Sequence, residues 1–156
     1  MTLAAAGMVL SEKAVAQAGA SPHVATIQEI YAAFGRGDMD AMLERLDPLI
    51  EWDYGWNEPL PLYRLRRGRS EVPGFFAELV HEFEFVTFQP FAFLEGASAE
   101  GLPMVCACID VELRARTTGK TVKDIEVHLW TFGVDGKAAR LRHLIDTRQI
   151  AAALTQ

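Results

Sequence analysis

Residues 103–148 read PMVCACIDVELRARTTGKTVKDIEVHLWTFGVDGKAARLRHLIDTR. Apolar and polar residues alternate through much of this stretch, which is the period of a strand with one buried face. Two turn signals divide it, Thr118-Gly119-Lys120 and Asp135-Gly136-Lys137. The stretch therefore predicts three strands, near 103–117, 121–134 and 137–148, which form an antiparallel meander. A further strand is expected near 83–94.

The chain ahead of these strands has mainly helical periodicity. Ser21-Pro22 is a helix-start signal, and apolar residues at helical spacing predict a first helix over 22–35. Asp38 caps a second helix, a short strand is expected over 49–54, and a third helix begins near Ser70. Helices followed by a run of strands predict an α+β fold, in which three N-terminal helices cover one face of a curved antiparallel sheet.

Length and charge narrow the class of protein. The chain has 156 residues, of which 50% are hydrophobic, so one domain with its own core is expected over 21–156. The formal net charge of -6 gives no electrostatic reason to bind nucleic acid or an anionic membrane. We therefore expect neither as a partner.

Residues 1–20 are expected to be an N-terminal extension. The apolar run at 3–10 has no Lys or Arg before it, which favours a loose or helical extension over a signal peptide. No segment reaches the roughly 18–20 apolar residues that span a bilayer. Cys106 and Cys108 are two apart on a predicted strand, which opposes an unstrained bridge, so we expect free thiols and a cytoplasmic location.

Short motifs occur along the chain in an order typical of one family. They are Tyr31-Ala32-Ala33-Phe34 with Gly37-Asp38, Gly68 ahead of a helix containing Phe75-Phe76, and the two turns of the meander. Over about residues 22–154 this order resembles the SnoaL-like and ketosteroid-isomerase branch of the nuclear transport factor 2-like superfamily. The resemblance implies a cone-shaped sheet that encloses a pocket, a small hydrophobic ligand, no cofactor, and commonly a homodimer through the outer sheet face.

Asp53 falls where the resemblance places the carboxylate that moves a proton beside a carbonyl, if one residue is deleted before it. Its neighbours Trp52, Tyr54 and Trp56 would exclude water, and a partly desolvated carboxylate accepts a proton more readily. Asp53 is therefore the candidate general base. The alternative is a solvent-facing acid at the end of a strand.

His128 falls where those isomerases place an acid that hydrogen-bonds the developing oxyanion. An imidazole N–H can act as that donor. Glu126 and Trp130 share its side of the strand, because side chains alternate. Counting back from Gly37-Asp38 puts the isomerases' phenolic partner at Ile30, with Tyr31 one position away.

His143 shares a strand face with Leu141 and Ile145, and that face lines the pocket in relatives. A lone histidine among apolar neighbours is more often a core residue than a catalyst. A partnership with His128 or Asp53 would make it the third candidate catalytic residue, because ionisable groups in one apolar pocket separate acid and base roles. The expected substrate contacts are Tyr31, Trp52, Tyr54, Trp56, Phe76, Glu126, Trp130 and Ile145.

A metal site is not expected. Asp124, Glu126 and His128 alternate along one strand, and ligands in one line seldom converge on an ion without help from another strand. The leading hypothesis is a cofactor-independent isomerase, cyclase or dehydratase that transfers a proton on a hydrophobic carbonyl compound. The alternatives are a non-catalytic ligand-binding domain and a dimerisation module whose own side chains fill the cavity.

Overall fold

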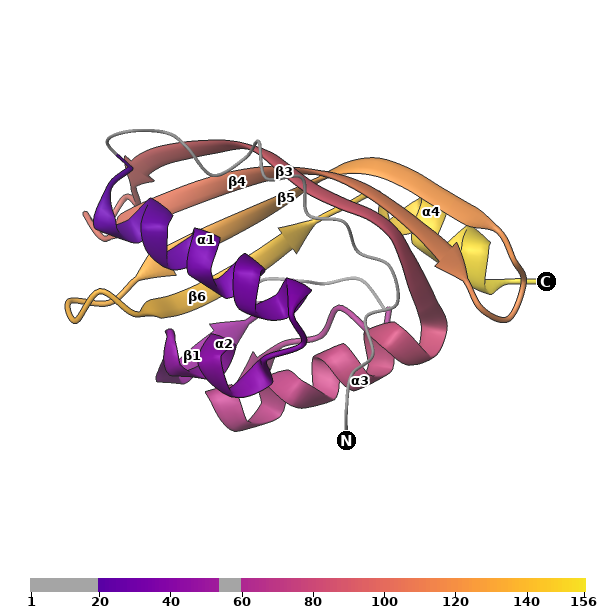
Figure 1. Cartoon of the computed structure of the whole chain (residues 1–156), viewed down its shortest axis with the longest axis horizontal. Helices are drawn as coiled ribbons and strands as arrows, with labels where there is room; N and C mark the ends of the chain where they lie inside the picture. The colour runs from indigo at the N-terminus through magenta and orange to yellow at the C-terminus, as the bar shows by residue number, and fades with distance from the viewer. Residues whose placement is uncertain (1–19, 54–59) are drawn as a thin grey trace.

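A computed structural model describes residues 20–53 and 60–156. Within them six strands form one curved sheet in the order β2-β1-β6-β5-β4-β3, and Figure 1 shows the long strands arching over helices. The strands are β1 (Leu46–Trp52), β2 (Arg66–Arg67), β3 (Phe83–Ala97), β4 (Pro103–Ala115), β5 (Thr121–Phe132) and β6 (Ala138–Leu144). The helices are α1 (Pro22–Gly35), α2 (Met39–Glu44), η2 (Arg69–Glu71), α3 (Val72–Glu82) and α4 (Thr147–Leu154). The predicted α+β fold with one curved sheet is confirmed.

The first two helices begin where the sequence predicts, because each has a capping side chain. Oγ of Ser21 accepts a hydrogen bond from the backbone N–H of Val24 at 3.3 Å. Oδ1 of Asp38 accepts one from the N–H of Ala41 at 3.1 Å. Gly37 turns the chain between the helices with a φ of 69°, which glycine adopts without strain. The apolar stripe of α1 is buried in the core.

Strands β4, β5 and β6 form the predicted meander. In its register, His128 on β5 lies directly opposite His143 on β6. Side chains of opposed residues point to the same face of a sheet, and both histidines are buried. The meander therefore brings the two candidate histidines together on the inner face.

One pair of strands departs from the predicted antiparallel sheet, since β1 runs parallel to β6. The two strands are far apart in sequence, so no tight turn forces them to be antiparallel. The pairing continues past the end of β1, where the N–H of Asp53 donates to the carbonyl oxygen of Leu141 at 2.8 Å. This contact places Asp53 beside the strand that carries His143.

The C-terminal boundary was predicted wrongly. Strand β6 ends at Leu144, and the chain continues into α4, where Oδ1 of Asp146 accepts hydrogen bonds from the N–H groups of Arg148 and Gln149 at 3.0 and 3.1 Å. The alternation of the last strand had hidden this helix cap. The described residues therefore contain four α-helices, of which α1 and α2 precede the sheet.

The face of the sheet away from the helices, here called the outer face, carries apolar side chains. Leu94 is 60% exposed and Ile125 is 56% exposed. The free thiols of Cys106 and Cys108 lie on the same face, in register with Leu94 and its neighbours. Among the described residues, no helix is long and apolar enough to cross a membrane. Residues 1–19 of the predicted extension lie outside the described residues, as do Tyr54 and Trp56.

Candidate functional site

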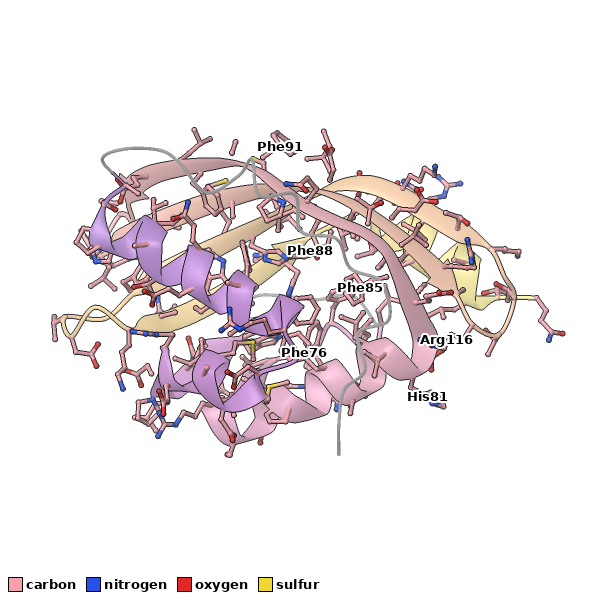
Figure 2. All side chains as sticks on the ribbon, in the orientation of Figure 1. Phe76, His81, Phe85, Phe88, Phe91 and Arg116 are labelled. Atoms are coloured by element: carbon pink, nitrogen blue, oxygen red, sulfur yellow. The ribbon has the colours of Figure 1, made fainter. Side chains whose placement is uncertain are left out.

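A cavity of about 40 Å³ lies between the helices and the inner face of the sheet. Much of its wall is aromatic, and Figure 2 shows Phe76 on α3 and Phe85 and Phe88 on β3 between the two layers. The volume is close to that of one water molecule, so a larger molecule can enter only if side chains move. Ionisable or hydroxyl side chains in the wall include Tyr31, Glu126, His128 and His143.

Asp53 and His143 form a buried pair beside this cavity. Nδ1 of His143 lies 2.7 Å from Oδ1 of Asp53, and the same oxygen accepts the backbone N–H of His143 at 3.1 Å. Asp53 has a φ of 61°, a left-handed conformation that a short polar side chain tolerates. Its side chain therefore turns back toward β6, and the pairing leaves Nε2 of His143 for the cavity.

The pairing changes the proton affinity of His143. Burial lowers the pKa of His143, but the charge of Asp53 and the hydrogen bond to it outweigh burial, so the pKa is raised from its usual 6.5. Glu126 adds to the rise, and Arg66 opposes it. The ring also stacks on Phe75, with centroids 5.0 Å apart. His143 is thus a positioned histidine whose protonated form is stabilised by a carboxylate.

His128 is held by a chain of hydrogen bonds from β5 to α1. Nε1 of Trp130 donates to Oη of Tyr31 at 3.1 Å, and Oη lies 2.8 Å from Nδ1 of His128. An indole N–H can only donate, so Tyr31 accepts it, which leaves the phenol O–H to donate to Nδ1. A neutral His128 then carries its proton on Nε2, the assignment that satisfies the Trp130 N–H, the Tyr31 hydroxyl and Nδ1 of His128.

Burial favours neutral His128. It lowers the pKa of His128, and although the charge of Glu126 opposes this effect, the pKa remains below 6.5. Burial also raises the pKa of Tyr31 well above 10, so its phenol remains protonated and can donate. The two histidines in one cavity therefore carry pKa shifts of opposite sign.

Glu126 supplies a second carboxylate. Its Oε1 lies 3.3 Å from Nε2 of His128, yet within the described structure this buried nitrogen makes no hydrogen bond of acceptable geometry. Burial raises the pKa of Glu126, but the charges of His128 and His143, with the contact to His128, outweigh burial and lower it. An ionised carboxylate therefore faces both imidazoles.

No protein-family model and no curated protein matches the sequence. Solved structures do match it. An NTF2-like protein from Burkholderia thailandensis is 26% identical, with a TM-score of 0.71 over 88% of this chain and 100% of that chain. One from Burkholderia xenovorans is 25% identical, with a TM-score of 0.70 over the same shares. The chain belongs to the nuclear transport factor 2-like (NTF2-like) superfamily.

Other solved structures with a similar fold have names that refer to an activity. A candidate polyketide cyclase from Xanthomonas campestris is 22% identical, with a TM-score of 0.64 over 86% of this chain and 97% of that chain. Candidate isomerases from Rhodopseudomonas palustris and Bacillus subtilis also match this NTF2-like chain, at 15% and 17% identity. At these identities the likeness concerns the fold.

The sequence-predicted site residues of this NTF2-like protein fall into three groups. The cavity wall contains His128, His143, Tyr31, Trp52, Phe76, Glu126 and Trp130. Asp53 lies behind His143, outside the wall, and Ile145 packs half-buried against the core because β6 ends before it. Tyr54 and Trp56 lie outside the described residues. Tyr31, one position from the Ile30 that the count gave, has its hydroxyl 2.8 Å from Nδ1 of His128.

Two residues near the NTF2-like cavity were missed as site residues. Tyr63 is buried in the wall, with its ring 5.8 Å from that of His143. Arg66 is 3% exposed, pairs with Glu78 at 2.7 Å and lies over the ring of Phe75. The arginine cluster at 64–69 gave no signal that one member is buried, because the partner lies on a helix farther along the chain.

The structure also groups three side chains whose types bind metals. One donor atom each of Glu126, His128 and His143 lies within 4.8 Å of the others, and all three residues are buried. Asp124 lies with Glu126 and His128 on the single strand β5. Here His143 contributes from the adjacent strand β6, in a geometry that one strand cannot provide.

Proposed function

We propose that this NTF2-like protein is an acid–base enzyme that transfers a proton on a hydrophobic carbonyl compound, as an isomerase, cyclase or dehydratase. The observation that carries the proposal is the carboxylate–histidine pair of Asp53 and His143 beside a second, differently tuned histidine in one aromatic cavity. Groups with separated proton affinities are what acid and base roles require. Cyclase- and isomerase-named proteins among the solved neighbours are consistent with this chemistry.

In the proposed mechanism, His143 is the base. Its Nδ1–H is held by Asp53, so Nε2 of the neutral ring accepts the proton from carbon. The imidazolium that forms is stabilised by the adjacent carboxylate, as in other carboxylate–histidine pairs. Asp53 therefore acts as a positioning and charge-stabilising residue, in place of the direct base that sequence analysis proposed.

His128 is the proposed donor at oxygen. Its neutral ring presents Nε2–H near the same cavity, with the proton fixed there by the Trp130–Tyr31 chain. A neutral imidazole can stabilise an enolate oxygen or a leaving hydroxyl by hydrogen bonding. The same donor thus serves isomerisation, ring closure and dehydration.

A second candidate function follows from the size of the cavity. A space of about 40 Å³ is far below the roughly 300–1,000 Å³ of ligand pockets, which favours a module whose own aromatic side chains fill the interior. The catalytic proposal requires the aromatic wall to open for substrate. Buried charged pairs are costly, however, and a purely structural module gains little from two carboxylates and two histidines in its core.

The proposed function is tested by proton exchange and turnover on a panel of enolisable ketones and β-hydroxy ketones. We expect His143→Gln to abolish exchange, whereas His81→Gln, at an exposed position on α3, leaves it unchanged. Ligand-induced stabilisation without exchange would favour a binding domain. Absence of both effects would favour the structural module.

We also propose that two copies of the chain pair through the outer face. The proposal is supported by apolar side chains that remain exposed there, among them Leu94 and Ile125. A sheet covered by helices on one side normally keeps a polar outer face, so exposed apolar side chains among the charged ones there are available to another copy. This arrangement leaves the inner cavity of each copy intact.

A further inference from the structure

Glu126, His128 and His143 form a set of side chains typical of metal sites. The acid–base proposal does not require such a set. We propose that these three side chains bind one divalent transition-metal ion, of the class that includes Zn²⁺ and Fe²⁺. Two imidazoles and one carboxylate are a familiar ligand set for these ions, whereas Mg²⁺ and Ca²⁺ prefer oxygen ligands. The sequence alone predicts no metal site here.

The distances support a shared ion. Oε1 of Glu126 and Nε2 of His128 are 3.3 Å apart, which matches two ligands about 2.0–2.1 Å from one tetrahedral ion. The third donor, on His143, lies within 4.8 Å of both, so a modest side-chain rotation completes the set. Three protein ligands leave a fourth position for water or substrate, as in catalytic metal sites.

The buried nitrogen of His128 provides independent support. His128 is 5% exposed, and among the described residues its Nε2 makes no hydrogen bond of acceptable geometry, although a carboxylate oxygen lies 3.3 Å away. A buried polar atom without a partner is costly, which makes it a candidate to bind something in the cavity. The cavity of about 40 Å³ has room for an ion with one water molecule.

Both histidines already have the outer partners that metal ligands use. Nδ1 of His143 pairs with Asp53, which gives a carboxylate–histidine arrangement, and Nδ1 of His128 contacts Tyr31. Coordination through Nε2 of His128 places the ring proton on Nδ1. The hydrogen bond to Tyr31 then reverses direction, with Nδ1 donating to the phenol oxygen. Two buried carboxylates, beside imidazoles that are neutral when they bind a metal, also supply the negative charge that a divalent cation balances.

A bound cation would occupy the nitrogen of His143 that accepts the proton in the mechanism above. The metal-bound form would then not perform that proton transfer, and this consequence alone rests on the proposed function. Binding itself does not depend on it.

The test uses the full chain without an affinity tag, titrated with ZnCl₂ and, separately, MgCl₂ by calorimetry. We expect one zinc per chain, no magnesium binding, and loss of the zinc site in His128→Gln and Glu126→Gln. His81→Gln is the matched control and keeps the site. Asp53→Asn should retain the stoichiometry but weaken binding roughly 10- to 100-fold, as outer-partner changes do.

Wild-type protein provides a measurement that does not depend on variants folding. Added Co²⁺ should broaden the ring signals of His128 and His143 in NMR spectra and leave those of His23 and His81 sharp. Zinc binding that persists in both ligand variants, or broadening at His23 or His81 alone, would overturn the metal site. Exchange of ketone protons without zinc binding would overturn the metal site and support the proposed function. Zinc binding by a chain that exchanges no ketone protons would support the metal site and count against the proposed function.

Discussion

The rings of His128 and His143 meet edge to face with their centroids 4.6 Å apart, and the pKa of each is shifted in the opposite direction. Burial acts on both rings in the same sense. The difference comes from their partners, since Asp53 binds His143 directly while the closest contact of His128 is a phenol.

In metal-free protein, the ring of His143 should titrate above 6.5 and that of His128 below it. Between the folded pKa of His128 and 6.5, the unfolded chain binds more protons, so stability rises with pH. The stabilisation from His143 is complete below 6.5 and is lost as pH rises through its raised folded pKa. These two residues together should give a maximum near pH 6.5 in the free energy of unfolding, which urea unfolding measures.

Variants separate the two sides of this maximum. His128→Gln should flatten the rise at low pH, and His143→Gln the fall at high pH, while His81→Gln keeps both. Glu126, Asp53 and Arg66 face the same rings and shift the midpoints without changing the signs. A stability that changes in one direction only across this range would contradict the assignment.

Asp53→Asn should lower kcat/KM on a responsive ketone by about 10²- to 10⁴-fold, the usual contribution of general-base catalysis, here by the histidine that Asp53 positions. Asparagine tolerates the left-handed backbone of this position but carries no charge to stabilise the imidazolium. Asp40→Asn, at an exposed position on α2, is the control. Equal rates in a folded Asp53→Asn protein would remove the pair from the mechanism.

Tyr31→Phe should destabilise the fold by about 1–3 kcal/mol, because it leaves Nε1 of Trp130 and Nδ1 of His128 without their shared partner. The free energy of unfolding in urea measures this. Trp130→Phe completes a double-mutant cycle, in which the two changes together should cost less than their sum. Additive costs would show that the hydrogen-bond chain is not a coupled unit.

Ile125→Lys should convert a homodimer to a monomer, because it replaces an exposed apolar side chain of the outer face with a charged one. The mass in solution, measured by light scattering during gel filtration, reports the change. Val134→Lys is the matched control, since Val134 is fully exposed in the turn after β5. A monomeric wild type would disprove the dimer, and dissociation by both variants would place the interface elsewhere.

Local signals determined most of the fold. The caps Ser21 and Asp38 and the turn glycines act within a few residues, so the sequence was sufficient to predict those boundaries. Helix α4 was missed because its cap, Asp146, follows directly on a strand pattern. The parallel pairing of β1 with β6 was also missed, since it joins distant segments and leaves no local pattern.

The candidate site also combines features that local sequence patterns predict with features that depend on distant contacts. Strand alternation correctly grouped Glu126, His128 and Trp130 on one face, and the meander predicted a possible partnership with His143. The orientation of Asp53 could not be predicted, because it depends on one left-handed residue after β1. The position of the Tyr31 hydroxyl depends on how α1 is rotated against the sheet. A count along the chain cannot resolve that rotation to one residue.

The small cavity also has a kinetic consequence. If the space between α3 and β3 holds little more than one water molecule, the aromatic rings must separate before a ketone can enter. Such an opening step is unimolecular, and it limits how fast the complex can form. The observed association rate should therefore level off as ligand concentration rises, at a ceiling set by the motion of the phenylalanine rings.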